Sequence, residues 1–325
     1  MGGFILRRLL QAMLVLVVVS FLVFAGVYLV GDPVDVLISP EATAIERLRV
    51  TRELGLDQPL WVQYLRFAGH ALQADFGNSF LAGQPAMALI IERMPATLEL
   101  AAVATLLAIV VGVPVGLYAG LKPDTGTAKF AMTLSVLGFS LPTFWVGLML
   151  IMGLSVMTGW LPSSGRGELV YLGPVGLSVL TLDGLKHLAL PALTLGLGTA
   201  SLLARLTRAT AREVVPMDFV KFARAKGLSE RRVITVHVLK NLMIPLVTIL
   251  GLEFGRMAAF AVITESIFAW PGMGKLLIDS VLTLDRPVVV AYVLIVVSFL
   301  IALNLLVDVT YGILDPRIRL GESSR

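Results

Sequence analysis

Few residues of this chain have the types and spacings that catalysis or metal binding requires. The three histidines, His70, His187 and His237, lie far apart in the sequence, and none belongs to a His-Glu-x-x-His zinc motif. Ser155 and Ser178 each follow a Gly-x-Ser pattern but lack the closing glycine of a nucleophile elbow. The chain has no cysteine, which removes thiolate ligands and disulfides. The sequence therefore predicts no metal site and gives no indication of an enzyme.

One glycine-rich run imitates a phosphate-binding loop without meeting its requirements. Gly274 and Lys275 match the end of the G-x-x-x-x-G-K-[ST] pattern. Ala269 stands where the first glycine should be, and Leu276 replaces the Ser or Thr that would hold magnesium. The chain is therefore not expected to bind a nucleotide by that route or to carry a cofactor of its own. Energy from ATP would have to arrive through another subunit.

The composition is that of a membrane protein. Of the 325 residues, 57% are apolar and only 15% are charged, and the mean hydropathy is +0.89. A soluble globular domain carries about a quarter charged residues. The net charge of +4 does not indicate nucleic-acid binding, because the basic residues gather at the ends of the long apolar runs. Membrane lipid is the expected surrounding.

Six apolar stretches approach or exceed the roughly 20 residues that a helix needs to cross a bilayer. They are residues 9–30, 100–121, 130–159, 188–204, 242–263 and 288–307. Pro142 lies within the third stretch, and charged residues interrupt the fifth. The first stretch is too long for a secretory signal and lacks a convincing cleavage site. The sequence thus predicts an all-α membrane protein with six transmembrane helices.

Lysine and arginine set the expected orientation, because they concentrate in cytoplasmic loops. They cluster at residues 7–8, 122–129, 205–240 and 317–319, so both termini are expected in the cytoplasm. We expect an N-terminal segment and first span at 1–30, a small extracytoplasmic insertion at 31–95, a five-span core at 96–313 with a cytoplasmic loop at 206–241, and a cytoplasmic tail at 314–325. A second outer segment, 161–186, carries an apolar piece at 169–182 that is too short to span.

The longest basic segment between spans predicts two short helices with a break between them. Phe219, Phe222 and Ala223 follow helical spacing, Gly227 can supply a left-handed turn that closes a helix, and Ser229 suits an N-cap. Such a segment would project from the cytoplasmic ends of the spans. The pattern alone fits a basic amphipathic segment lying on anionic lipid equally well.

This segment resembles the EAA loop of binding-protein-dependent ABC permeases, in which an alanine four residues before a glycine marks a short helix that docks on an ATPase. Ala223 and Gly227 have that spacing. Lys221 replaces the usual glutamate, and Pro245 lies further from Gly227 than in the generic pattern. Both departures are similar to the Ala-Arg-Ala-Lys-Gly form of the peptide and nickel permeases. The resemblance implies ATPase coupling through Asp218, Phe219, Phe222, Ala223, Arg224, Ala225, Lys226, Gly227, Leu228 and Arg231.

The likeness extends along nearly the whole chain. Six blocks resemble the first-subunit type of the peptide and nickel uptake family: residues 54–59, 75–79, 95–100, 190–195, 268–272 and 315–319. The resemblance implies a permease like those of type I ABC importers, in a bacterial or archaeal plasma (inner) membrane. Its implied partners are a second homologous permease, two ATPase subunits that bind ATP and Mg²⁺, and an extracytoplasmic solute-binding protein. The implied cargo is short peptides or a related small solute such as nickel complexes or glutathione.

Polar and helix-breaking residues within the spans are candidates for the translocation path. Glu253 and Arg256 stand one helical turn apart, so they would either neutralise each other or face the bundle interior. Pro142, next to two aromatic residues, would either make a bend that opens and closes or merely pack. The candidate path residues are Ser140, Pro142, Phe144, Trp145, Glu253 and Arg256.

The turn after the fifth span is a candidate contact for the solute-binding protein, because its glycines let a partner approach the backbone closely. It comprises Trp270, Pro271, Gly272, Met273 and Gly274. The competing interpretation is an ordinary tight turn with the tryptophan anchored at the membrane interface.

A stand-alone secondary carrier or channel is the alternative from another class. Such a protein would be expected to show an internal inverted repeat and an ion site near the bilayer midplane. The sequence shows neither feature. Purification with or without bound ATPase subunits would separate the two classes.

Overall fold

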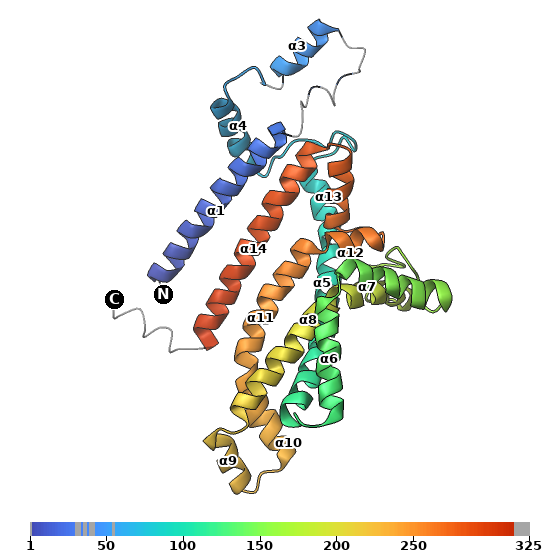
Figure 1. Cartoon of the computed structure of the whole chain (residues 1–325). Helices are drawn as coiled ribbons and strands as arrows, with labels where there is room; N and C mark the ends of the chain where they lie inside the picture. Colours follow the sequence, from blue (N-terminus) through green and yellow to red (C-terminus); the bar gives the residue numbers. More distant parts are fainter. Residues whose placement is uncertain (1, 30–33, 35–37, 39–42, 54–55, 315–325) are drawn as a thin grey trace. The chain divides into compact units, whose positions relative to one another are not determined.

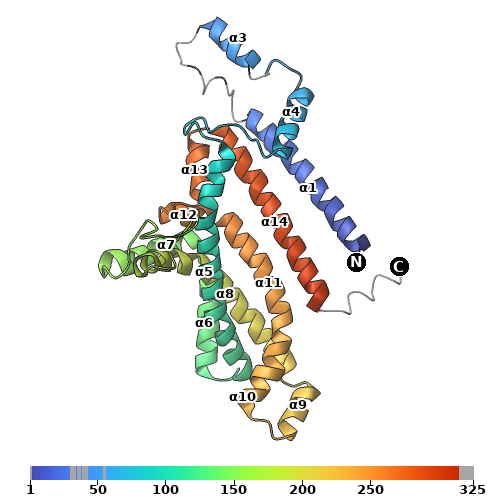
Figure 2. The same ribbon diagram turned by 180° about the vertical axis from the view of Figure 1, so that it is seen from behind.

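The computed structural model describes residues 2–29, 34, 38, 43–53 and 56–314 (Figures 1 and 2). The chain is mostly helical and divides into two compact units. The first comprises Met1–Pro95 and Gly272–Ala302, and the second comprises Ala96–Pro271 and Leu303–Arg325. The blocks and basic residues noted at 315–319 lie outside the described residues.

The first unit contains α1 (Gly2–Leu29), α3 (Ala44–Glu53), α4 (Leu60–Leu72), α13 (Met273–Leu282) and the first parts of α5 (Ala86–Leu121) and α14 (Arg286–Leu314).

An aromatic cluster holds α1 and α4 of this unit together. Phe21 and Phe24 of α1 meet the Tyr64 ring of α4 edge-on, with centroids 5.6 and 5.5 Å apart. The hydroxyls of Ser20 and Tyr64 are hydrogen-bonded at 2.9 Å. Part of the segment predicted as an outer insertion therefore packs back on the first helix.

Helix α8 is the central element of the second unit, and it packs against α6, α7, α11 and α12. The elements that follow α5 in this unit are α6 (Gly126–Ser140), α7 (Thr143–Leu150), the π-helix η1 (Ile151–Met157), strands β1 (Val170–Leu172) and β2 (Val175–Leu177), α8 (Leu182–Val214), α9 (Asp218–Ala225), α10 (Glu230–Arg232), the π-helix η2 (Val233–Val238), α11 (Leu239–Phe260) and α12 (Val262–Ile267).

Glycines set how closely α5 approaches α8. Gly112, Gly116 and Gly120 recur every four residues and so share one face of α5. A Cβ atom at Gly112 would lie 2.5 Å from the carbonyl oxygen of Ala200, and one at Gly116 would clash with the carbonyl oxygen of Ala204 one turn later on α8. Small residues on a shared face let membrane helices pack with their backbones in contact. The α5–α8 pair therefore has no room for larger side chains at these positions.

Among the described residues, three helices are long and apolar enough to cross a membrane: α5, α8 and α14. The number rises to five if each of two bent pairs is one span. One pair joins α6 to α7 and η1 with a bend of 107°, and the other joins Glu230–Met243 to Pro245–Phe260 with a bend of 51°. Helix α1 carries a shorter apolar stretch, Leu10–Gly26. The spans predicted at 100–121, 188–204 and 288–307 all lie within single helices.

Two structural details go beyond the predicted all-α chain with a partly helical outer insertion at 31–95 and a second outer segment at 161–186. The apolar piece at 169–182 forms a small antiparallel hairpin of β1 and β2, in which Gly173 makes the turn with φ +65°. Helix α5 begins at Ala86, inside the predicted insertion, because the residues before Pro95 already favour helix. The prediction that the 169–182 piece is not a span agrees with the hairpin.

Candidate functional site

Helix α9 projects at the end of the second unit where α8 ends and α10 begins (Figures 1 and 2). Its inner face is fixed: Val220 and Ala223 are buried in a hydrophobic cluster that also contains Val233 of η2. Its outer face is aromatic, since the side chains of Phe219 and Phe222 are 39% and 61% exposed. The sequence pattern therefore gives a short helix that is anchored on one side and presents two phenylalanines on the other.

Gly227 ends α9 in the left-handed conformation that its sequence position predicts, with φ +75°. The backbone N–H of Leu228 donates to the carbonyl of Ala223 at 3.3 Å, and that of Gly227 donates to the carbonyl of Arg224 at 2.9 Å. This pair of bonds is a Schellman motif, which requires positive φ at the residue after the C-cap. Leu228 then packs against the hydrophobic cluster beneath α9. The glycine therefore fixes the direction in which the chain leaves the helix.

An ion pair bridges the turn between α9 and α10. The guanidinium of Arg224 donates to the two carboxylate oxygens of Glu230 at 3.1 and 2.7 Å. These hydrogen bonds lower the pKa of Glu230 below its usual range and raise the pKa of Arg224. Ser229 stands at the predicted N-cap, but its side chain makes no capping hydrogen bond. The bridging pair, and not the serine hydroxyl, links the two helices.

The second helix of this segment is not short, which corrects the prediction. Helix α10 runs directly into η2 and then into α11, so that one bent helix extends from Glu230 to Phe260. The bend lies beside Pro245, which has no N–H and cannot join the helical hydrogen-bond ladder. The segment that leaves the Gly227 turn is thus continuous with the fifth predicted span.

The break in the third predicted span borders a cavity of about 390 Å³. Helix α6 ends at Ser140, and α7 begins after Pro142, whose missing N–H suits the start of a helix. The lining comes from α6 and α7, α8, α11 and α12, and it includes Leu141, Thr143 and Arg256. Of the candidate path residues, only Arg256 lines the cavity; the others are Ser140, Pro142, Phe144, Trp145 and Glu253. The two aromatic residues are exposed on α7.

Glu253 and Arg256 form the ion pair that their spacing predicts, and Arg256 also lines the cavity. The guanidinium Nη2 of Arg256 donates to a carboxylate oxygen of Glu253 at 2.5 Å. The hydroxyl of Thr199 on α8 donates to the same carboxylate at 2.9 Å. These contacts fit a self-contained pair, and the polar wall of a translocation path stays a prediction.

Trp270 is buried in the interior of the second unit, and a contact of this turn with a solute-binding protein stays a prediction. Its side chain is 0% exposed, and its Nε1–H donates to the carbonyl of Ala96 at 2.9 Å. Gly272 is the N-cap of α13 in extended backbone, so Met273 and Gly274 belong to a helix and not to an open loop. The tryptophan side chain is accordingly unavailable to a docking partner in this structure.

A buried polar network beside Trp270 was missed by the sequence analysis. Glu99 accepts hydrogen bonds from Arg166 at 2.6 Å and from the backbone N–H of Val179 at 2.8 Å. Glu265 is fully buried and accepts from the hydroxyl of Thr97 at 2.6 Å. The available signal was an acidic residue at the start of an apolar run, which demands a partner when buried. Among the described residues, no group of three His, Cys, Asp or Glu could hold a metal ion.

Two protein families match the sequence. Residues 112–320 match the binding-protein-dependent transport system inner membrane component, and residues 1–101 match the N-terminal part of a binding-protein-dependent transport system membrane component. The chain is 39% identical to the dipeptide transport system permease protein DppB of Escherichia coli (strain K12), over 97% of this chain and 98% of that one. It is 40% identical to the glutathione transport system permease protein GsiC of Salmonella paratyphi A, over 98% and 99%.

A solved structure shares the fold. The MetNI methionine ABC transporter in inward-facing conformations matches with a TM-score of 0.52 and 17% sequence identity, over 70% of this chain and 95% of that one. The helices, the continuous apolar spans and these matches define a multi-pass inner membrane permease subunit of an ABC importer, a non-catalytic component. The chain belongs to the family of binding-protein-dependent transport system inner membrane components.

Proposed function

We propose that this chain forms half of the translocation path of an ATP-driven importer of short peptides or of a related small solute such as glutathione or a nickel complex. Relatives that match almost the whole chain are named for dipeptides, for di- and tripeptides and for glutathione. Those names support a cargo with a peptide backbone. The second half of the path would be a homologous permease, and an extracytoplasmic solute-binding protein would deliver the cargo.

In this proposal α1 is also a membrane span, which brings the number of spans from five to six, and both termini lie in the cytoplasm. Its apolar stretch, Leu10–Gly26, is somewhat shorter than the roughly 20 residues of a typical span, but the helix itself runs from Gly2 to Leu29. The bent α6–α7–η1 and α10–η2–α11 helices supply two further spans. The clustering of basic residues at 122–129 and 205–240 supports this orientation.

Helix α9 would dock on one of two ATPase subunits, which bind ATP and Mg²⁺ in place of this chain. A docking helix needs an exposed apolar face and a fixed direction. Phe219 and Phe222 supply the face, and the buried Val220 together with the Gly227 turn supplies the direction. The left-handed Schellman turn at Gly227 is the observation that carries the proposal. Closure of the ATPases would move α9 and, through the continuous helix that follows it, the walls of the path.

The cavity at the α6–α7 break is proposed as part of that path. The cavity borders the break between α6 and α7 on one side. On the other side it borders the part of α11 where Glu253 and Arg256 stand one helical turn apart. Intramembrane charges usually face the interior of a helix bundle or a water-filled space. Arg256 would meet the cargo there, while Glu253, which also accepts from Thr199, accepts from its guanidinium and orients it.

The test of coupling is the substitution Gly227→Val. A Cβ at this position would meet no atom within 4 Å, so the effect comes from the backbone conformation and not from a clash. A β-branched residue at positive φ costs at least about 1–2 kcal/mol and would turn the segment away from its direction. We expect the complex to lose solute-stimulated ATP hydrolysis and uptake while the chain stays inserted in the membrane, and Gly227→Ala to be milder.

Gly126→Val is the matched control, because that glycine also has open space around it but lacks positive φ. It should leave uptake close to that of the unchanged protein. Normal uptake by Gly227→Val, combined with loss of uptake when Lys221, Arg224 and Lys226 are neutralised, would favour a lipid-lying segment instead. Purification of an active transporter without any ATPase subunit would favour the stand-alone carrier.

A further inference from the structure

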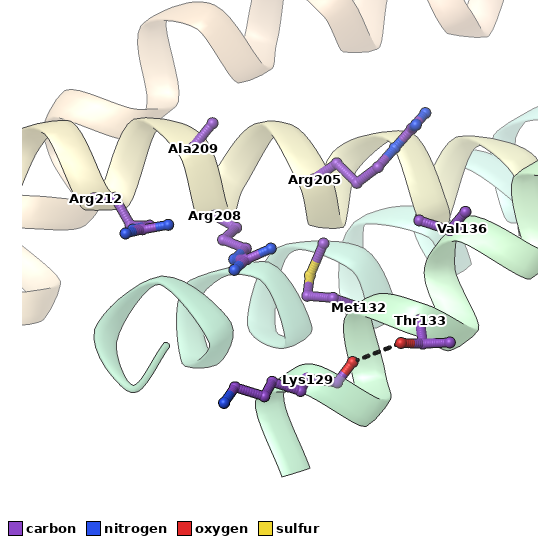
Figure 3. Close-up of a pocket in the computed structure, with 8 residues that line it drawn as sticks. All are labelled: Lys129, Met132, Thr133, Val136, Arg205, Arg208, Ala209 and Arg212. Atoms are coloured by element: carbon purple, nitrogen blue, oxygen red, sulfur yellow. Dashed lines mark hydrogen bonds between the residues drawn. The ribbon is translucent and has the colours of Figure 1, made fainter. Parts of the chain in front are cut away.

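A second cavity, of about 550 Å³, lies between α6 and α8, and basic side chains from both helices line it (Figure 3). Its lining residues are Lys129, Met132, Thr133 and Val136 of α6 and Arg205, Arg208, Ala209 and Arg212 of α8. Four of the eight are basic, and none of these described lining residues is acidic. A cavity with this much positive charge and no internal counter-charge is suited to an anion.

Two of the arginines that line this cavity have a buried donor atom without a partner among the described residues. The Nε atoms of Arg205 and Arg208 are buried and have no hydrogen-bond partner within the part of the chain that the structure describes. Arg205 stacks its guanidinium over the ring of Phe139, 4.3 Å from the centroid, which orders the side chain without satisfying its donors. A buried N–H without a partner is costly, so an external acceptor would stabilise this arrangement.

The position of the cluster along α8 matches a membrane surface. Arg205, Arg208 and Arg212 are spaced by three and four residues, so they share one face of the helix. They follow directly after the apolar stretch 188–204, where the span leaves the hydrocarbon core. Lys129 stands in the first turn of α6 and completes the group from the neighbouring helix.

An apolar surface continues from the cavity along α6. The side chains of Phe130, Leu134 and Leu137 are all exposed, and their spacing puts them on one face of the helix. Thr133 and Val136, in the same stretch of α6, line the cavity itself. A cationic cavity at the end of a span, next to an exposed apolar face, is complementary to one molecule with an anionic head and hydrocarbon tails.

We propose that this cavity binds the phosphate head group of an anionic phospholipid whose acyl chains lie along α6. Guanidinium groups bind phosphate oxygens through paired, charge-assisted hydrogen bonds, and basic pockets between membrane helices bind such head groups. Arg208 and Arg212 would make the principal contacts, because Arg205 is already stacked on Phe139. The site is separate from the α9 surface and from the cavity at the α6–α7 break.

The experiment uses the assembled transporter, purified in detergent, and phosphatidylglycerol as the probe. Native mass spectrometry would measure its affinity for the complex, with phosphatidylethanolamine for comparison. We expect Arg208→Gln/Arg212→Gln to weaken phosphatidylglycerol binding about 25-fold, from about 5-fold for each of the two charges near a membrane surface. Arg208→Lys/Arg212→Lys should keep most of the affinity, and phosphatidylethanolamine binding should change little.

Lys122→Gln/Lys240→Gln removes the same charge from exposed positions outside the cavity and serves as the control. An equal loss of affinity in this control would reduce the effect to general surface charge and overturn the proposal. So would unchanged phosphatidylglycerol binding by the two-arginine glutamine variant, or displacement of the lipid by millimolar inorganic phosphate. Loss of a partner subunit from that variant with lipid affinity intact would assign the cluster to an acidic protein segment instead.

Discussion

At the scale of single residues, Glu253 is held by two donors while its partner Arg256 reaches the cavity. The carboxylate accepts from Thr199 and from Arg256, and its side chain is 14% exposed, whereas that of Arg256 is 58% exposed. The carboxylate of Glu253 thus orients the guanidinium of Arg256, and more than half of the arginine side chain stays exposed. We propose from this asymmetry that Glu253 positions Arg256 and that Arg256 makes the contact with the cargo.

A double-mutant cycle would separate the structural contribution of this pair from its contribution to transport. Glu253→Gln leaves the arginine charge uncompensated, and we expect a coupling energy of about 1 kcal/mol in the stability of the complex, at the upper end for an exposed pair. Glu253→Gln/Arg256→Gln should regain stability but not uptake, because the cavity has lost its cation. Thermal denaturation of the purified complex and vesicle uptake give the two readouts, and recovery of both would show a purely structural pair.

Local chemistry explains which residues could be predicted from the sequence. Gly227 was predictable because a glycine after a helical run supplies positive φ through its own backbone. Trp270 and Arg166 were not, because their burial depends on contacts made with residues 67 to 174 positions away along the chain. A tryptophan near a span end has the same local pattern whether it lies at a membrane interface or in the interior.

At the scale of elements, the packing of α5 on α8 depends on glycines whose hydrogen atoms face the neighbouring backbone. We expect Gly116→Val to prevent stable assembly, since overpacking costs about 1–3 kcal/mol even where side chains can move and here the obstacle is a carbonyl group. Gly153→Val is the matched control, because a Cβ at that glycine meets nothing within 4 Å. Comparing the amounts of both variants in purified membranes tests this, and equal accumulation would contradict it.

The length of an apolar run in the sequence predicts some of the helices but not the other elements. Long apolar runs predicted α5, α8 and α14, because only a helix satisfies its backbone within the segment. Pro142 predicted a break in the third run, but the 107° angle depends on how α7 packs against α8 and α12. The β1–β2 hairpin was too short for an alternating pattern to show. The continuity of α10 with α11 was missed because the basic residues and the serine favoured a separate short helix.

At the scale of the whole molecule, the orientation in the membrane is testable because the chain has no cysteine of its own. Single cysteines in place of Glu46, Glu168 and Ser229 would each replace an exposed residue. The first two should react with a membrane-impermeant thiol reagent added from outside, and the third should react only after the membrane is opened. The reverse labelling pattern would overturn the proposed topology and the cytoplasmic location of α9.

The 51° bend beside Pro245 would turn a rotation of one helical arm about its own axis into a sideways displacement of the other arm. The arm Pro245–Phe260 is about 24 Å long at 1.5 Å per residue, so its far end lies about 19 Å to the side of the axis of the arm Glu230–Met243. If the arm Glu230–Met243 rotates about its own axis by about 10°, the far end of the other arm moves sideways by about 3 Å. Arg256 lies about 17 Å along this arm and about 13 Å to the side, so the same rotation, started at α9, would displace its backbone by about 2 Å without any helix having to slide along the membrane normal.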